Sequence, residues 1–350
     1  PVPRRGLIGI WDDGDDSFAD PRAPYPHARE VALLRAHETG CGFVAGGFAR
    51  TAEVAALVET GWAHDLVADR ATVRARSPHI IAPGDTDVAL ARDPGARTAR
   101  LPAVAFAAAR RALEADAPVL VQVPRRGYVP SLACAKCRTR AACRHCHGPL
   151  ALGADEEVQA PTCRWCGIAD PAYRCGACGS RSLRALVVGA ARTAEELGRA
   201  FPGVAVVRSG GSEVLATVPG GPKLVVSTVG AEPVAAGGYG AALLLDGWAL
   251  LGRADLRAAE EAMRRWMGAA ALVRPGGGVV VGAEPAVPTV QALIRWDPVG
   301  HAAAQLAERA EVGFPPAVRV AAVDGAADAI ETLLDLAELP TGAEQLGPVP

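Results

Sequence analysis

Four Cys-x-x-Cys pairs between Cys134 and Cys178 constrain this chain more than any other feature of its sequence. A Cys-x-x-Cys turn presents two thiolates to one metal ion, and four thiolates complete the tetrahedral coordination of Zn²⁺ without leaving a position for water or substrate. Such sites are structural rather than catalytic. We therefore expect two Zn²⁺ ions per chain, held by eight cysteines: Cys134, Cys137, Cys143, Cys146, Cys163, Cys166, Cys175 and Cys178.

The residues around the pairs support metal binding. Gly167 and Gly179 directly follow the second cysteine of their pairs, where a tight turn favours glycine because glycine tolerates positive φ. A disulfide cluster is the alternative, but such clusters are typical of small secreted domains and no secretory signal is in view. Neither His145 nor His147 is needed as a ligand, because eight cysteines fill two sites. The spacing leaves sequential, interleaved and nested pairing of the four units open.

Length and composition indicate a globular protein of several domains. The 350 residues exceed what one hydrophobic core usually supports, so we expect two or three domains. Half of the residues are apolar and 21% are charged, which excludes a wholly disordered chain. No apolar run approaches the ~20 residues of a bilayer span, so we expect a cytoplasmic protein. The first residues lack an initiator Met, and we expect the chain to be a segment of a longer protein.

The net charge of −2 conceals a local excess of positive charge. Between Arg125 and Arg184, ten Lys or Arg residues stand against four Asp or Glu residues, a surplus of six. This stretch predicts contact with an anion such as nucleic acid. Lys136 and Lys223 are the only lysines of the sequence, and neither stands in a GxxxxGK[ST] phosphate-binding loop.

Strand and helix patterns alternate along the N-terminal third. A strand at residues 7–10 ends at the acidic run Asp12-Asp13-Gly14-Asp15-Asp16, and a helix around 31–36, a strand at 41–45 and a helix at 51–60 follow. This alternation predicts an α/β fold with a parallel sheet and helices on both faces. The acidic run at the end of a strand is either an Mg²⁺ site or a solvated turn, and we expect the turn.

A second α/β unit follows a linker at residues 85–101. Its expected elements are a helix at 103–115, a strand at 119–123, a helix at 193–200, strands at 204–207, 224–227 and 241–245, and a helix at 254–267. The cysteine pairs interrupt this unit after its first strand, so we expect an inserted zinc module. Beyond residue 314, a strand at 318–323 and a helix at 326–336 predict the opening of a third domain.

One family combines these features. Arg125-Arg126-Gly127-Tyr128-Val129-Pro130, followed by the cysteine pairs, resembles the RRGY-x-P motif and double-zinc insertion of the PriA family of replication restart proteins. Three further matches occur in the family's order: residues 25–32 resemble its Y-H-A-R-D-x-A segment, residues 255–260 its D-F-R-A-x-E segment and residues 314–316 its Y-P-P. The likeness extends along nearly the whole chain.

The resemblance implies an architecture of two degenerate RecA-like helicase lobes. It assigns residues 1–95 to the C-terminal part of lobe 1, residues 96–132 and 181–312 to lobe 2, residues 133–180 to the double-zinc module and residues 313–350 to the start of a C-terminal α+β domain. In the family the first and last cysteine pairs share one zinc and the inner pairs share the other. The implied ligand sets are Cys134, Cys137, Cys175 and Cys178 for the first site, and Cys143, Cys146, Cys163 and Cys166 for the second.

The sequence departs from the family at its ATPase motifs. The family's DEEH, whose acidic residues hold Mg²⁺ and activate water, stands here as Asp12-Asp13-Gly14-Asp15, and its S-A-T-P as Gly46-Gly47-Phe48-Ala49. Glu232 replaces the lysine of its A-K-G-x-D-F-P motif, and the two arginines of its Q-x-x-G-R-A-G-R motif fall on Ala269 and Leu272. An arginine finger contributes roughly 10³–10⁵ to the rate of phosphoryl transfer. We therefore expect degenerate remnants here, with neither a catalytic residue nor a working ATP and Mg²⁺ site.

These departures predict a replication restart and primosome assembly factor that binds branched or single-stranded DNA at stalled forks without helicase activity of its own. By resemblance its partners are primosome proteins, the single-stranded-DNA-binding protein and the replicative helicase that it helps to load, all at the nucleoid. The alternative is an active ATP-dependent 3′–5′ DNA helicase with divergent motifs. A GxxxxGK[ST] loop elsewhere in the protein would favour that alternative.

Expected DNA contacts fall in two places. Phe18 and Tyr25 flank a Pro-rich loop in the place of the family's aromatic-rich DNA-sensing loop, where bases stack on rings, and packing against the neighbouring helix is the alternative. Trp165 either contacts a partner or fills the zinc module. A solubilising surface is the alternative to DNA contact for the basic candidates at the zinc module, which are Arg125, Arg126, Arg138, Arg140 and Arg144.

Overall fold

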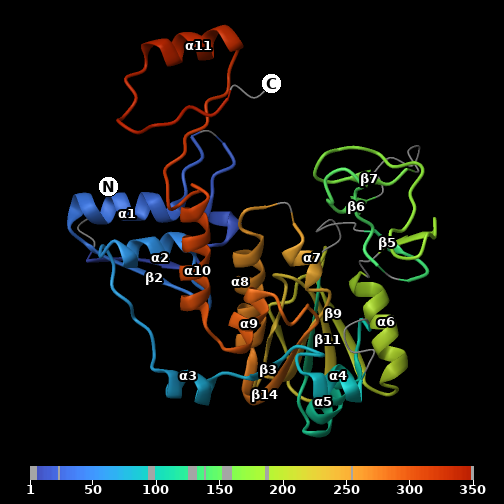
Figure 1. The fold of residues 1–350 in the computed structure, drawn as a ribbon. Helices are drawn as coiled ribbons and strands as arrows, with labels where there is room; N and C mark the ends of the chain where they lie inside the picture. Colours follow the sequence, from blue (N-terminus) through green and yellow to red (C-terminus); the bar gives the residue numbers. More distant parts are fainter. Residues whose placement is uncertain are drawn as a thin grey trace.

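The structure, a computed structural model, combines a small N-terminal unit, a six-stranded sheet, a cysteine-rich module and a projecting tail (Figure 1). It describes residues 6–22, 24–93, 99–124, 132–137, 139–151, 160–185, 189–253 and 255–347.

The N-terminal unit is a β-α-β arrangement followed by a helix. Strand β1 (Leu7–Trp11) pairs in parallel with β2 (Gly42–Gly46), and α1 (Ala28–Thr39) connects them after a short 3₁₀ turn, η1 (Asp16–Phe18). Helix α2 (Ala52–Glu59) begins where the Thr51 side chain accepts a hydrogen bond from the backbone of Val54, an N-cap that satisfies one of the helix's free N–H groups. The unit therefore places the acidic run at the carboxyl end of β1.

The second unit is built on a six-stranded, fully parallel sheet. Its strand order is β3-β14-β13-β4-β11-β9. The strands are β3 (His79–Ile81), β4 (Val119–Val123), β9 (Ala205–Ser209), β11 (Lys223–Thr228), β13 (Tyr239–Leu244) and β14 (Val273–Val281). Every residue of the central strands β4 and β13 is buried, as expected where helices cover both faces of a parallel sheet.

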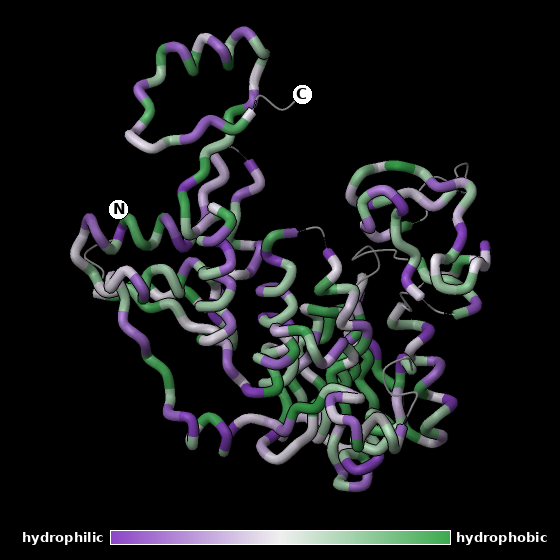
Figure 2. The backbone as a smooth tube through the Cα atoms, viewed as in Figure 1, coloured by the Kyte–Doolittle hydropathy of each residue, from purple (hydrophilic) through white to green (hydrophobic). Residues whose placement is uncertain are grey.

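Alternate side chains of the central strands point into two separate cores. Leu120 faces the core formed with α8 (Ala258–Ala271) and α9 (Pro288–Ile294). Its neighbour Val121 faces the core formed with α5 (Ala103–Glu114) and α6 (Ala190–Ala200). This period of two is the geometry of a strand buried on both faces. Figure 2 shows the resulting concentration of hydrophobic residues around the sheet.

The two units contact each other through helix packing. Helix α10 (Pro298–Glu311) follows α9 and packs on α2, so that Ala302 and Leu306 share an apolar cluster with Ala52 and Ala55. Strand β3 already belongs to the large sheet, because it pairs with β14. The change from the small sheet to the large one thus falls between β2 and β3, ahead of the limit at residue 95 expected from the sequence.

Five other elements lie around the sheet unit. Short helices α3 (Arg70–Arg76) and α4 (Asp87–Arg92) flank β3 in the chain, and α7 (Trp248–Leu251) follows β13. The stretch expected to be a linker therefore contains α4. Strands β10 (Thr217–Val218) and β12 (Val234–Ala235) form a separate two-stranded sheet.

The cysteine-rich module lies beside the sheet and between β4 and α6 in the chain (Figure 1). It contains two small antiparallel sheets: β5 (Leu132–Cys134) pairs with β8 (Leu183–Ala185), and β6 (Leu150–Ala151) pairs with β7 (Thr162–Cys163). Half of its buried core residues are cysteines, and the others are Leu132, Ala141, Leu150 and Tyr173. So small an apolar core indicates that bound metal supplies much of the module's stability.

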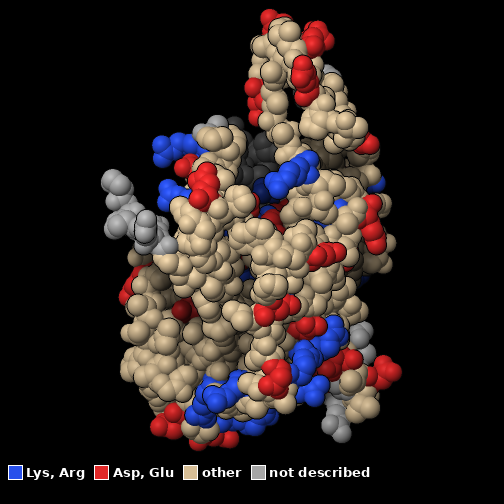
Figure 3. All heavy atoms as spheres, turned by 90° about the vertical axis from the view of Figure 1, so that its left-hand side faces the viewer, with Lys and Arg blue, Asp and Glu red and all other residues tan. Residues whose placement is uncertain are grey.

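The tail after α10 projects away from both units. Helix α11 (Ala327–Leu336) coincides with the expected helix. The prediction of a strand at residues 318–323 was wrong. These residues adopt no regular structure, and Val318, Val320 and Val323 are exposed. A strand needs a neighbouring strand to pair its backbone groups, and none lies beside this segment in the part of the chain that the structure describes. Acidic side chains gather on the projecting tail in Figure 3.

Helices of the described residues offer no candidate for a membrane span, since none combines the necessary length and apolar character.

Candidate metal centres and the charged cleft

The eight paired cysteines form two clusters of four. The first contains Cys134, Cys137, Cys175 and Cys178, and the second contains Cys143, Cys146, Cys163 and Cys166. In each cluster, all sulfur atoms lie within 4.8 Å of one another. The first pair thus joins the last and the two inner pairs join each other, which is the nested arrangement implied by the resemblance.

Sulfur–sulfur distances agree with tetrahedral metal coordination. Cys134 Sγ lies 3.4 Å from Cys178 Sγ, and Cys143 Sγ lies 3.7 Å from Cys166 Sγ. Four sulfurs placed 2.3 Å from one Zn²⁺ ion would be about 3.8 Å apart. The donor set fits zinc, because thiolates are the ligands that structural zinc sites use.

Backbone groups hold the second cluster in shape. The N–H groups of His145 and Trp165 point at the sulfurs of Cys143 and Cys163, at 3.3 and 3.4 Å. Gly167 has a φ of 72°, as expected for a glycine at the end of a metal-binding turn. The ligand geometry is therefore set by the turns themselves.

Arg144, an expected DNA contact, is bound inside the module. Its guanidinium forms two hydrogen bonds with the carboxylate of Asp170, one of them 3.0 Å from Nε to Oδ2. Asp170 is buried, and Arg144 is largely exposed. This bidentate pair connects the two inner knuckles of the module, so Arg144 already has a structural partner.

Arg140, another expected DNA contact, joins the module to the sheet unit. Its guanidinium carbon lies 4.9 Å from the centre of the Trp248 ring, and its Nη2 donates to the Trp248 carbonyl at 3.2 Å. A Cβ atom added to Gly252 would come within 3.0 Å of the same Nη2. The Arg140 side chain therefore packs closely against α7.

The other residues expected to contact DNA differ in their exposure, and three of them lie outside the described residues. Tyr25 is exposed, whereas Phe18 is half-buried with its ring 6.3 Å from that of His27. Arg125, Arg126 and Arg138 lie outside the described residues.

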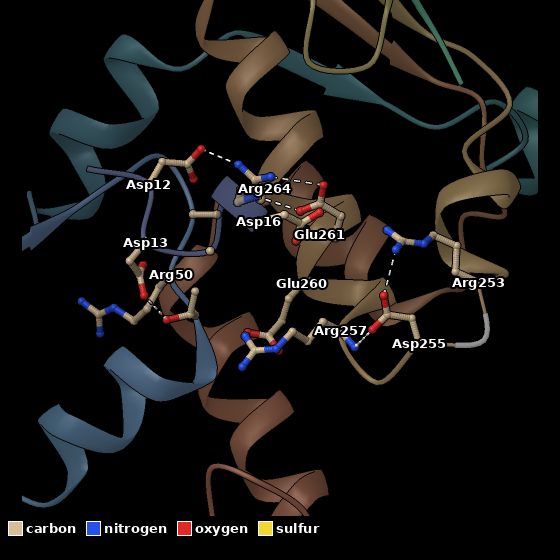
Figure 4. A pocket seen from close by; sticks show the side chains of 13 residues that line it. Asp12, Asp13, Asp16, Arg50, Arg253, Asp255, Arg257, Glu260, Glu261 and Arg264 are labelled. Carbon is tan, nitrogen blue, oxygen red and sulfur yellow. Dashed lines mark hydrogen bonds and ion pairs between the residues drawn. The ribbon is translucent and has the colours of Figure 1, made fainter. Parts of the chain in front are cut away.

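A charged cleft separates the acidic run from helix α8 (Figure 4). The cleft is open to solvent. Its lining is charged rather than apolar, with six acidic residues, Asp12, Asp13, Asp16, Asp255, Glu260 and Glu261, and four arginines, Arg50, Arg253, Arg257 and Arg264. The question is which of these charges are free to bind a ligand.

Arg264 reaches across the cleft and forms ion pairs with two side chains of the acidic run. From α8 it donates to Asp12 at 2.5 Å and to Asp15 at 3.0 Å, and on its own helix it pairs with Glu261 at 2.8 Å. Burial opposes the charge of Arg264, but Glu261 and Asp12 outweigh it and raise the pKa of the guanidinium. Burial likewise opposes ionisation of Asp15, yet hydrogen bonds from Ser17 and the nearby arginines lower its pKa to about 2.

Asp13 is held on the other side of the run. Its Oδ2 accepts a hydrogen bond from Arg29 Nη1 at 2.7 Å and another from the Thr51 hydroxyl at 2.8 Å. All three side chains are buried. An Mg²⁺ ion would have to replace a buried ion pair to reach this carboxylate.

One further ion pair and one hydrogen bond cross between the units. Arg257 of the sheet unit pairs with Glu53 of α2. Glu260 of α8 accepts a hydrogen bond from the N–H of Ala52 at 2.8 Å and pairs with Arg309 of α10. Burial raises the pKa of Glu260 even though these partners favour its charge. The cleft is therefore a place where two units are fastened together.

The sequence analysis did not find these basic partners. Ala269, aligned with an arginine finger, is buried in α8, while the arginines that face the acidic run are Arg264 and Arg265 of the same helix. Their spacing from Glu261, three and four residues, was the available signal for a charged helix face.

Comparison with known proteins agrees with the motifs. No protein-family model matches the chain. Among curated proteins, it is 62% identical over 356 residues to the probable replication restart protein PriA of Mycobacterium tuberculosis, covering all of this chain and 54% of that protein. The protein of the same name from Mycobacterium leprae is 61% identical over 352 residues, with the same coverage. The replication restart protein PriA of Treponema pallidum is 28% identical over 374 residues, covering 99% of this chain and 55% of that protein.

The chain spans about half the length of the curated relatives it matches. The match covers the whole of this chain in the two mycobacterial proteins and therefore spans both units and the cysteine-rich module. The chain therefore belongs to the PriA family of replication restart proteins.

Proposed function

We propose that this chain is the central part of a replication restart factor that binds forked or single-stranded DNA and does not use ATP to move along it. In this proposal the N-terminal unit and the sheet unit are the remnants of two RecA-like lobes, and the tail begins a C-terminal domain. The protein would act at the nucleoid, with primosome proteins, the single-stranded-DNA-binding protein and the replicative helicase as partners. The names of its relatives support the role in replication restart.

One observation supports the proposed absence of ATP-driven movement: the carboxylates of the acidic run are already ion-paired within the protein. An ATP-hydrolysing site needs carboxylates that are free to hold Mg²⁺, and it needs lobes that move relative to each other during turnover. Here Asp12 and Asp15 are paired with Arg264, and Asp13 with Arg29. The contacts of Arg264 with Asp12 and Asp15 also attach the N-terminal unit to α8.

The arginines of the cleft are also unavailable to phosphate groups. Arg50 pairs with Asp65 at 2.5 Å, Arg253 with Asp255 at 2.9 Å, and Arg257 with Glu53. A nucleotide would have to break several ion pairs before gaining its own. The cleft is better suited to rigid attachment of the two units than to nucleotide turnover.

We propose Zn²⁺ in both cysteine clusters, with a structural role. Each site would hold its knuckles together, and with them the surface that the module offers to DNA. Four thiolates around one Zn²⁺ leave a net charge of −2, so two filled sites offset four of the six surplus positive charges between Arg125 and Arg184. Attraction to phosphate must therefore come from particular exposed side chains rather than from the module's total charge.

Within the described part of the cysteine-rich module, the exposed basic side chains for which no ion pair is seen are Lys136, Arg164, Arg174 and Arg181. We propose these as phosphate contacts, together with Arg125, Arg126 and Arg138. Arg140 and Arg144 are better explained as structural residues, because each has a partner within the protein.

The experiment measures binding and unwinding of one forked duplex by the full-length, zinc-loaded protein, with an ATP-hydrolysing DNA helicase as the positive control. We expect fork binding that weakens as salt increases, with the same affinity in the presence and absence of ATP, and no strand separation. ATP-dependent unwinding above the no-protein background would contradict the proposal and favour an active helicase. Absence of fork binding would contradict the DNA-binding part.

A further inference from the structure

Trp165 stands on the second cysteine cluster and is exposed. It lies between Cys163 and Cys166, and 54% of its surface is accessible to solvent. Tryptophan is highly buried on average in folded proteins. The filling of the module does not account for this residue, since Trp165 does not belong to the module's buried core.

The ring is nevertheless held in one place. It packs over Gly148 of the opposing knuckle so closely that a Cβ atom added to that glycine would lie 2.8 Å from two ring carbons. The backbone N–H of Trp165 points at Cys163 Sγ at 3.4 Å, and the backbone N–H of Arg164 donates to the Pro149 carbonyl at 3.0 Å. One side of the indole is thus fixed against metal-ligand turns, while the remainder is free. A rigid aromatic surface loses little entropy when a ligand binds.

The surroundings of the ring are basic. Arg164 is exposed next to it, and His145 and His147 are exposed on the opposing knuckle. Asp170 is the one carboxylate of the two knuckles in the described structure, and it is buried and paired with Arg144. An anion can therefore approach the exposed indole without meeting an exposed carboxylate of the described knuckles.

We propose that Trp165 is a stacking platform for one unpaired base of single-stranded DNA, with Arg164 contacting a neighbouring phosphate. An aromatic ring with an adjacent cation matches the two parts of a nucleotide, because the base has a π-face and the backbone is anionic. The site is insensitive to base identity for the same reason. A protein partner fits less well, because Ile168 is the other exposed large hydrophobic residue of the described knuckles, and a stable protein interface buries about 800 Å² per partner.

This inference rests on the proposed DNA binding and adds the position at which an unpaired strand is held. It also separates two kinds of contact within one knuckle. Stacking on Trp165 contributes affinity that salt does not screen, whereas the Arg164 contact releases counterions and so depends on salt.

The experiment is an affinity titration of a labelled single-stranded oligonucleotide with the full-length, zinc-loaded protein. The variants are Trp165→Ala, Trp165→Phe, Arg164→Ala and, as a matched control, Trp62→Ala, which removes an exposed tryptophan from the N-terminal unit. We expect Trp165→Ala to weaken binding about 5- to 150-fold, Trp165→Phe to retain most of the affinity, and Trp62→Ala to leave it unchanged. Arg164→Ala should reduce the log–log salt slope by about 0.7, and Trp165→Ala should not change the slope.

An oligonucleotide whose bases are removed along its length tests stacking directly. Wild type and Trp165→Ala should bind it equally, so that the difference between them depends on the bases. Equal affinity of wild type and Trp165→Ala for the normal oligonucleotide would overturn the inference while leaving the proposed function intact. Failure of wild type to bind any DNA would overturn both. If Trp165→Ala loses zinc, the comparison of wild type on normal and base-free strands decides, and equal affinities overturn the inference.

Discussion

The motif resemblance aligns Asp13 with an acidic residue that holds Mg²⁺ in the PriA family, but in this structure Asp13 is bonded to neighbouring side chains of the protein. Arg29 and the Thr51 hydroxyl occupy one of its carboxylate oxygens, in a site from which water is largely excluded. The acidic residue is thus retained, but the groups bonded to its carboxylate are side chains of the protein itself. The sequence predicted a degenerate site from the shortened motif, but it contained no signal that Arg29, sixteen residues away, would be the partner.

Replacing Asp13 should destabilise the protein without any ligand being involved. Asp13→Ala leaves the buried guanidinium of Arg29 without its closest partner, at a cost of about 3–5 kcal/mol in the free energy of unfolding. Asp16→Ala is the matched control, because Asp16 is exposed in the same run, and it should change stability by less than ~0.5 kcal/mol. Urea unfolding of the three proteins measures both effects. Equal destabilisation by the two substitutions would show that Asp13 has no special structural role.

His301 should make stability depend on pH. It is buried in α10, where burial lowers its pKa to about 4 although the charge of Asp297 acts in the opposite direction. Between pH 6.5 and pH 4 the unfolded chain binds a proton that the folded chain does not, so the contribution of His301 is complete above pH 6.5 and is lost as pH falls toward 4. The loss amounts to about 3 kcal/mol at most.

The measurement is the free energy of unfolding from pH 7 to pH 5 for wild type and His301→Gln. Burial also raises the pKa of Glu260 and Asp246, and the comparison with the variant cancels these other contributions. Wild type should lose more stability than His301→Gln over this range. Parallel curves would mean that His301 is not buried in its neutral form.

At the scale of elements, the sequence predicted regular, apolar stretches best. The strand at 119–123 and the helix at 103–115 agree with β4 and α5 to within one residue, since burial imposed a clear pattern on both. Strand β14 was missed because it begins Val-Arg-Pro-Gly-Gly-Gly, a composition typical of a turn. The sheet nevertheless pairs this segment with β13 and β3, and tertiary contacts override its local preference.

The nested metal sites could be predicted only from resemblance. Spacing allowed three arrangements of the four cysteine pairs, and the choice depends on how β5 pairs with β8 and how β6 pairs with β7. These short ladders bring together pairs that are distant in the sequence. Local patterns carry no information about such pairing.

Metal analysis tests the module as an element. Purified protein should contain two Zn²⁺ ions per chain, and Cys175→Ser should release about one while the second cluster keeps its own. Structural sites of this kind contribute about 10–16 kcal/mol each, so chelation of both should unfold the module. A content near one ion per chain, or ready disulfide formation without metal, would contradict this account.

The contact of Arg140 with α7 makes a separate prediction about attachment of the module. Arg140→Ala removes the guanidinium over the Trp248 ring, so hydrogen exchange of α7 should become faster while both zinc ions remain bound. Arg174→Ala is the control, because Arg174 is an exposed arginine of the same module. If exchange in α7 is the same in both variants, the module is held by other contacts.

At the scale of the whole molecule, the two units, which we propose to be remnants of helicase lobes, are attached to each other by several contacts. Apolar packing of α10 on α2 and four groups of ion pairs, centred on Arg264, Arg29, Arg257 and Arg309, lie between or beside them. Motors of this class need their lobes to open and close around nucleotide. The sequence predicted the loss of catalytic motifs, but the use of the same surfaces for attachment depends on long-range contacts that the structure alone provides.

The central claim is that the acidic run joins two units instead of supporting nucleotide hydrolysis. Its most direct test is steady-state ATP hydrolysis by the full-length protein with Mg²⁺ and saturating forked DNA, measured beside the Asp12→Asn variant. The account predicts that both proteins turn over ATP at the background rate, with no stimulation by DNA. DNA-stimulated hydrolysis by the wild type that Asp12→Asn abolishes would contradict it, since the carboxylate paired with Arg264 would then be serving catalysis.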